Sequence, residues 1–222
     1  MATKKTTEEV IEIRPIRMER VKLRIVGDTP LIVHKWSEKA KREMLEAQSG
    51  KKTAKKKEAK DPVADFISSL YWLTPEPKDK TEKGFAKAVR EGARFGFPVT
   101  AIKKAGLSAA YRKGWIKNRL VMAGDFFIQS DNDGLIEIHS SEPPEIREDM
   151  VKVGMGTADI RYRAMFRDWW ADLDITYDAD GAFGLDSIVN TLSAGGTICG
   201  IGEWRVEKSG QNGMFHIESM ES

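Results

Sequence analysis

The residues best suited to bind an anion lie in a glycine-rich segment, 195–213. Glycines let a backbone approach a ligand closely and expose its amides, and Arg205 and Lys208 would supply positive charge. The segment is not a P-loop, because Glu207 stands where a glycine should precede the lysine, and not a dinucleotide fingerprint, because Arg205 replaces the third glycine. The alternative is a tight helix-to-strand turn with a β-bulge. The residues expected to bind the anion are Gly200, Gly202, Arg205 and Lys208.

A second candidate region is defined by its charge. Residues 83–119 carry ten lysines and arginines and one acid, whereas residues 120–186 carry fifteen acids and five bases, although the formal net charge of the chain is only +2. The basic block predicts a surface that neutralises phosphates, with interleaved aromatic rings for stacking. The alternative is that these bases are the solvated faces of amphipathic helices that pair with the acidic half. The candidates are Lys103, Lys104, Tyr111, Arg112 and Lys113, with Trp115 as a second ring.

Other polar side chains offer little chemistry. The histidines have no metal-ligand spacing, and His34, beside Lys35 and Trp36, is the one histidine placed for an anion or base contact. Asp172 and Asp174 share a strand face, which a solvated surface explains as well as a cation site does. No nucleophile elbow, His-Glu-x-x-His motif or Cys-His arrangement is visible, so we expect no catalytic residue, metal or cofactor.

Composition narrows the class of protein. The chain has 222 residues, of which 41% are hydrophobic and 32% charged, so one domain is the default. The single cysteine, Cys199, excludes a disulfide framework and fits a reducing compartment. The longest uncharged run, 187–202, is too short and too polar to span a bilayer, and the N-terminus lacks the apolar stretch of a signal peptide. We expect a cytoplasmic protein with no membrane partner.

The elements of the first half follow from periodicity. Alternation over 20–27 predicts a half-buried strand, followed by a turn and a short extended piece at 31–34. Helices are expected over 38–48, from Pro62 to the prolines at 75 and 77, and over 98–113. Residues 1–9 are expected to be a disordered tail, and the lysine-rich stretch 50–60 a mobile linker.

The second half predicts a hairpin and an inserted arm. Strand character over 119–129 and an Asp-Asn-Asp-Gly turn predict a hairpin with 135–139. Residues 140–164 look like an arm outside the sheet, with Arg161 and Arg163 on one face at its base. Strict alternation over 169–177, a helix near 185–192 and a closing strand over 214–217 complete the chain. The resulting β-α-β-β-α-β order predicts an α+β, ferredoxin-like split βαβ domain over 10–222.

A glycine-rich loop after the last helix of such a fold, with a long insertion between its two halves, resembles the RAMP superfamily, which includes the backbone subunits of CRISPR surveillance complexes. The segments 161–213 and 96–103 are also similar to an uncharacterised bacteriophage protein family. The resemblance implies binding of single-stranded RNA or DNA, often along a filament of subunits, with Gly200, Gly202, Arg205 and Lys208 in the binding loop. The paired histidines of RNA-cleaving members are missing, so an RNA-processing nuclease is only a minor alternative.

The combined expectation is a non-enzymatic protein of phage type that binds single-stranded nucleic acid and forms a homo-oligomer or filament along it, within a larger phage or host complex. The alternative is a phage structural or interaction protein, such as a virion component or an inhibitor of a host defence complex. In that alternative, the basic and acidic blocks of neighbouring subunits would pair with each other.

Overall fold

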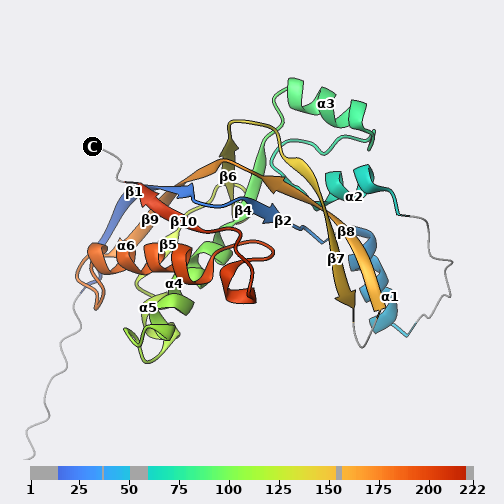
Figure 1. The fold of residues 1–222 in the computed structure, drawn as a ribbon. Helices are drawn as coiled ribbons and strands as arrows, with labels where there is room; N and C mark the ends of the chain where they lie inside the picture. Colours follow the sequence, from blue (N-terminus) through green and yellow to red (C-terminus); the bar gives the residue numbers. More distant parts are fainter. Residues whose placement is uncertain (1–14, 37, 51–59, 154–156, 219–222) are drawn as a thin grey trace, which may run out of the picture.

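The structure is a computed structural model that describes residues 15–36, 38–50, 60–153 and 157–218. The expected tail at 1–9 lies outside these residues, as does most of the expected linker at 50–60. The fold is mixed α+β, built around a mostly antiparallel sheet with several helices, as the sequence predicts (Figure 1).

Two long strands form the centre of the main sheet. β1 (Met18–Gly27) and β9 (Trp169–Asp178) pair antiparallel over nearly their whole length. Along β9 every second side chain is buried, as the alternation predicts, and these side chains form the middle of the core. β10 (Phe215–Glu218) pairs with the other edge of β1. Beyond β9 lie β5 (Phe126–Ile128), β6 (Leu135–Ser140), β4 (Phe95–Pro98) and β3 (Tyr71–Trp72).

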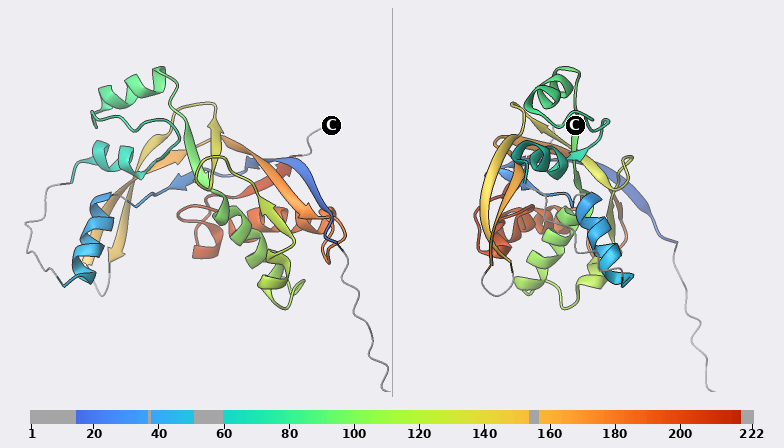
Figure 2. Two further views of the ribbon diagram at one scale, coloured as in Figure 1. Left: turned by 180° about the vertical axis from the view of Figure 1, so that it is seen from behind. Right: turned by 90° about the vertical axis from the view of Figure 1, so that its right-hand side faces the viewer.

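Helices cover one face of this sheet. α4 (Val99–Arg112) and α6 (Leu185–Ala194) pack against each other there, with α5 (Arg119–Ala123) beside α4 (Figure 2). A side chain at Gly195 would place its Cβ 2.6 Å from the backbone nitrogen of Gly106. The two helices approach this closely because both contact positions are glycines.

A second, smaller sheet forms the arm. Its strands are β2 (Leu31–Val33), β8 (Thr157–Phe166) and β7 (Glu145–Val153), in that order and antiparallel. The expected excursion at 140–164 is therefore a long hairpin of β7 and β8. Its strand β8 also pairs with β2, which comes from the N-terminal part of the chain. Three helices lie at the same end of the molecule as the arm (Figures 1 and 2): α1 (Glu38–Gln48), α2 (Pro62–Ser69) and α3 (Glu82–Arg90).

Several expectations about the elements are wrong in detail. Asp61 caps α2 as predicted, but the helix ends at Ser69 rather than near residue 75, because the chain turns extended at Leu70 to enter β3. Residues 119–129 begin with the short helix α5, capped by the Asn118 side chain, before β5 starts. The Asp133-Gly134 turn has positive φ at both residues, yet β5 and β6 do not pair with each other, because both pair with β9.

Candidate nucleic-acid interface

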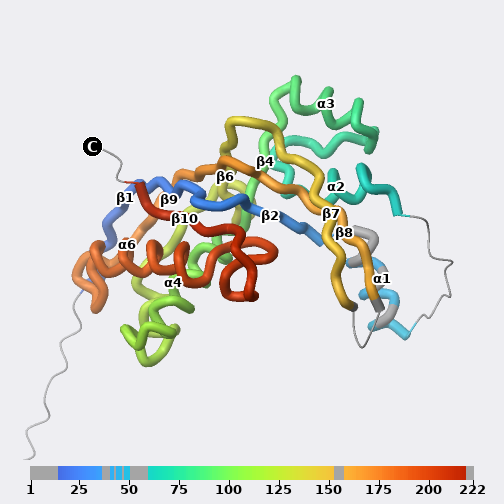
Figure 3. Tube along the Cα trace, viewed as in Figure 1, coloured from blue at the N-terminus to red at the C-terminus, as the bar shows by residue number. Residues whose placement is uncertain are grey.

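A groove of about 480 Å³ lies between α4 and the glycine-rich segment. The segment contains the π-helical turn Gly195–Cys199 and the 3-10 turn Val206–Lys208, and it runs beside β2 and α4 (Figure 3). The groove brings together residues that the sequence analysis selected from three separate regions. These are His34, Lys104, Gly200, Gly202 and Arg205.

The glycines of the segment serve backbone packing. Gly200 and Gly202 have φ of 66° and 78°, and a Cβ on Gly202 would lie 2.4 Å from the carbonyl oxygen of Ile32 in β2. The amides of Gly200, Ile201 and Glu203 all donate to backbone carbonyls, the last of them to Ile32 at 2.9 Å. These three amides are therefore not available to an anion, and the alternative of a tight structural turn explains the glycines.

Arg205 holds the segment together. Its Nη1 donates to the carbonyl of Gly202 at 3.1 Å, and its Nε and Nη2 donate to Glu207 Oε2 at 3.2 and 3.1 Å. Arg112, from the last turn of α4, donates to the other oxygen of Glu207 at 3.0 Å. One carboxylate thus fixes two of the predicted phosphate-binding arginines at the rim of the groove.

The opposite wall is a face of α4. Thr100, Lys104 and Ser108 follow one another at helical spacing and line the groove. Arg119, at the start of α5, also lines it, and its guanidinium lies 4.9 Å from the centre of the exposed Tyr111 ring. Within the described residues, neither Lys104 nor Arg119 has a carboxylate partner within 4.0 Å. Sequence reasoning missed Arg119, because it placed this residue at the start of a strand.

Two predicted residues are engaged elsewhere. The ammonium of Lys103 donates to the carbonyls of Ala123 and Phe126 at 2.7 and 2.6 Å and lies over the rings of Phe126 and Phe127, and this burial lowers its pKa. Arg163 is buried, with 4% of its side chain exposed, and its Nη1 donates to Asp149 at 3.0 Å. Both predicted cations are thus engaged by protein groups, and neither lines the groove.

Lys113 and Lys208 are exposed, at the C-cap of α4 and in the 3-10 turn, and they lie outside the lining of the groove.

A second hollow, of about 470 Å³, opens beside the middle of β8 in the arm. Arg161 lines it, with Lys35, Trp36 and Lys60, three residues that sequence reasoning had not selected for binding. His34 lines this hollow as well as the groove, so the two depressions adjoin at its side chain. The sequence signal for Trp36 and Lys35 was their position next to His34.

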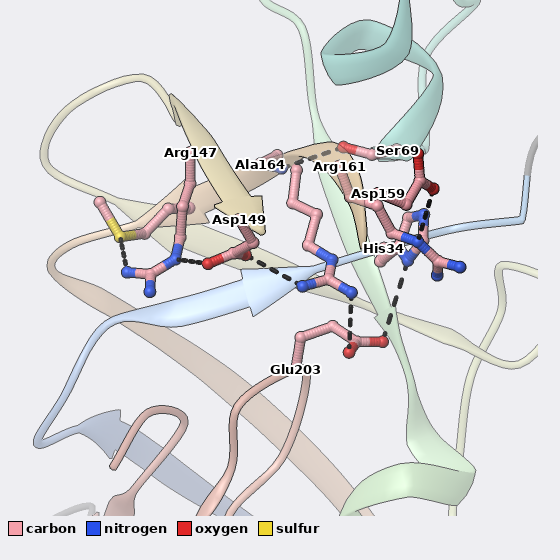
Figure 4. A network of polar contacts seen from close by, with 10 residues as sticks. His34, Ser69, Arg147, Asp149, Asp159, Arg161, Ala164 and Glu203 are labelled. Carbon is pink, nitrogen blue, oxygen red and sulfur yellow. Dashed lines mark hydrogen bonds and ion pairs between the residues drawn. The ribbon is translucent and has the colours of Figure 1, made fainter. Parts of the chain in front are cut away.

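A polar network connects the arm to the glycine-rich segment at this junction (Figure 4). Asp149 accepts from Arg147 and Arg163, and the second Nη of Arg163 lies 3.4 Å from Glu203, in the glycine-rich segment. Glu203 in turn lies 3.9 Å from His34 Nδ1. Burial, and then the positive charge of Arg163, lower the pKa of His34, so its imidazole is neutral at pH 7.

The uncovered face of the main sheet is electrostatically different. Arg20 and Arg24 of β1 pair with Asp174 and Asp172 of β9, and these hydrogen bonds hold the pKa of both carboxyls below the usual range. Arg94 is hydrogen-bonded to Glu137 in the same way. The aspartates proposed as a conceivable cation site are therefore taken by arginines. No cluster of three or more metal-ligating side chains is found among the described residues.

None of the helices in the described part of the chain has the length and apolar character needed to cross a membrane. Neither the protein-family models nor the curated proteins compared with this chain give a match.

Proposed function

We propose that this protein binds single-stranded nucleic acid, RNA or DNA, along the groove and the adjoining hollow, without catalysing a reaction on it. The observation that carries the proposal is the set of cations in the two depressions that have no carboxylate partner among the described residues: Lys35, Lys104 and Arg119. Lysine and arginine side chains that are not neutralised by the protein can exchange their counterions for phosphates.

The shape of the site favours a single strand. The depressions adjoin at His34 and together run from the face of α4 to the middle of β8 in the arm. Exposed rings lie at both ends, Tyr111 beside Arg119 and Trp36 beside Lys35, where unpaired bases could stack. A duplex keeps its bases stacked inside and offers no ring faces to such positions.

We further propose that the main sheet is a ferredoxin-like core. The strands β10, β1, β9 and β5 lie side by side in that order and are antiparallel, with α4 between β1 and β5 in the sequence and α6 between β9 and β10. A split βαβ fold has this order of strands and helices, and the agreement supports the proposal. The arm is inserted between the two halves, which supports the proposed relation to RAMP proteins and their phage counterparts.

The alternative, assembly through complementary charged blocks, has less support. Many carboxylates of the acidic block are already paired within the chain, including Asp172, Asp174 and Glu137 on the sheet and Asp149 in the arm. Paired carboxylates have little remaining attraction for the basic block of another copy. Assembly along a bound strand stays part of the proposal.

The test is the salt dependence of binding to oligothymidylate and oligouridylate, measured by fluorescence anisotropy with protein purified free of nucleic acid. Each phosphate neutralised contributes about −0.7 to the slope of log K against log salt. The double variant Lys104→Ala/Arg119→Ala should weaken binding and make the slope shallower by about 1.4. Lys83→Ala/Arg90→Ala, which removes the same two charge types from α3, should bind as the unchanged protein does.

Unaltered binding in the groove variant would remove the groove from the proposal. Failure of the unchanged protein to bind either strand would overturn the proposed function itself.

A further inference from the structure

Trp36 differs from the tryptophans that build the core. Trp72 and Trp169 pack against phenylalanine rings, and their indole nitrogens donate to backbone carbonyls. Trp36 has 56% of its surface exposed and makes no ring contact with the described residues. A large apolar ring held in water is unfavourable unless it has a ligand or partner to cover it.

The backbone around Trp36 is held in place. The amide of Lys35 donates to the carbonyl of Ser69 at 2.8 Å, which attaches the segment after β2 to the end of α2. The Ser69 hydroxyl donates to Phe66 and accepts from the amide of Ala164 in β8 at 3.0 Å. The strand end, the helix and the arm are therefore joined by hydrogen bonds at Lys35, the residue that precedes Trp36.

Three cations share the hollow that Trp36 lines. Lys35, Lys60 and Arg161 line the same hollow. Lys60 Nζ lies 2.5 Å from Asp159 Oδ1 and also donates to the Ile160 carbonyl, while Arg161 Nε lies 3.8 Å from Asp159. Asp159 thus holds Lys60 by a hydrogen bond, whereas its 3.8 Å contact with Arg161 is too long for one, and Lys35 has no carboxylate partner among the described residues.

We infer that the hollow beside the middle of β8 holds one nucleobase of the bound strand, stacked on Trp36, with its phosphate on Lys35 and Arg161. This inference rests on the proposed function and assigns the position of a base within it. Stacking on an indole does not read base edges, so every base is accepted. Trp115 is a natural comparison, because it is 54% exposed but lies in a different hollow, beside α6.

The experiment compares oligothymidylate with a strand of equal length whose sugars carry no bases, both longer than the roughly 4–16 nucleotides that single-strand sites cover. For oligothymidylate, Trp36→Ala should weaken binding about tenfold. Trp36→Phe should weaken binding less than Trp36→Ala does, and Trp115→Ala should leave the affinity unchanged. For the abasic strand, Trp36→Ala should bind as the unchanged protein does, because no base remains to stack. Thermal unfolding of each variant checks that the exposed substitutions leave the fold intact.

The outcomes separate the two claims. If the unchanged protein binds both strands equally and Trp36→Ala has no effect, the base position is wrong while the proposed function stands. If Trp36→Ala weakens binding to both strands equally, the ring acts on the backbone and the inference is again overturned. If the unchanged protein binds neither strand, the proposed function fails and the base position fails with it.

Discussion

The groove and the uncovered face of the main sheet both carry many charges, but they arrange them differently. On the sheet, Arg20 and Arg24 are directly opposite or diagonal to aspartates on the neighbouring strand, so each charge is neutralised where it stands. In the groove, Lys104 and Arg119 come from helices whose nearest acids, Glu203 and Glu207, are already bonded to other arginines. The comparison shows that the number of charges does not identify a binding surface, whereas the fraction left unpaired does.

The largest effect that sharpens this comparison is expected at Arg163. Its side chain is buried between Asp149 and Glu203, so Arg163→Ala leaves the buried Asp149 with Arg147 as its remaining partner and should lower the free energy of unfolding by about 3 kcal/mol. Arg24→Ala on the open sheet should change it far less, because water replaces an exposed partner. Urea unfolding of both variants measures the difference. Equal losses would mean that burial does not distinguish the two networks.

A second prediction concerns the glycine-rich segment. Gly202→Ala adds a Cβ against the Ile32 carbonyl at a positive φ and should destabilise the protein by more than about 2 kcal/mol. Gly92→Ala also requires a positive φ, but no atom lies within 4 Å, so it should cost only about 1–2 kcal/mol. Chemical unfolding curves compare the two. If Gly92→Ala costs as much as Gly202→Ala, close packing on β2 is not the reason for the glycine.

The third prediction concerns binding. Arg20→Ala/Arg24→Ala removes two cations from the sheet face, yet the affinity for oligothymidylate should stay within about twofold of that of the unchanged protein and the salt slope should not change, because those cations were neutralised already. Fluorescence anisotropy at several salt concentrations provides both quantities. A shallower slope for this variant would place the strand on the open sheet instead of in the groove.

The smallest effect on the free energy of unfolding is expected from His34. Its pKa is lowered in the folded protein relative to about 6.5 in the unfolded chain, so protons bind the unfolded state more readily. The stability contributed by neutral His34 is therefore present above pH 6.5 and is lost as the pH falls below it, by at most about 1.4 kcal/mol per pH unit. The groups that face it are Arg163, Glu203, Arg161 and Asp149.

Unfolding free energies of the unchanged protein and of His34→Gln, measured from pH 7.5 to 5.5, isolate this contribution. The unfolding free energy of the unchanged protein, minus that of His34→Gln, should be constant above pH 6.5 and should decrease as the pH falls below 6.5. A constant difference across the range would show that His34 does not titrate abnormally.

Local patterns predicted much of the fold. The alternation over 169–177 identified β9 and its buried side, and Asp61 with Pro62 identified the start of α2, because such signals depend only on neighbours in the sequence. The hairpin of 119–139 was wrong, because the pairing of β5 and β6 is decided by β9, a strand far along the chain.

The site was predicted less well for the same reason. Lys104 and His34, both selected from the sequence, line the groove, but Lys103, next to Lys104, donates to carbonyls near α5. Nothing in the sequence showed that Glu207 would fix Arg112, 95 residues away, or that Asp149 would bury Arg163. Such partners are chosen by strand register and helix rotation, which a single sequence does not reveal.

The attachment of the glycine-rich segment to β2 has a mechanical consequence. β2 belongs to the sheet of the arm. The carbonyl of Ile32 in β2 accepts from the amide of Glu203, and the carbonyl of Pro30, just before β2, accepts from the amide of Gly213. If the arm tilts, β2 moves with it, and the hydrogen bond from Glu203 to β2 moves the wall of the groove as well. We therefore expect the width of the groove to change together with the angle of the arm. A neighbouring molecule that displaces the arm would then also change the groove in which we propose that phosphates bind.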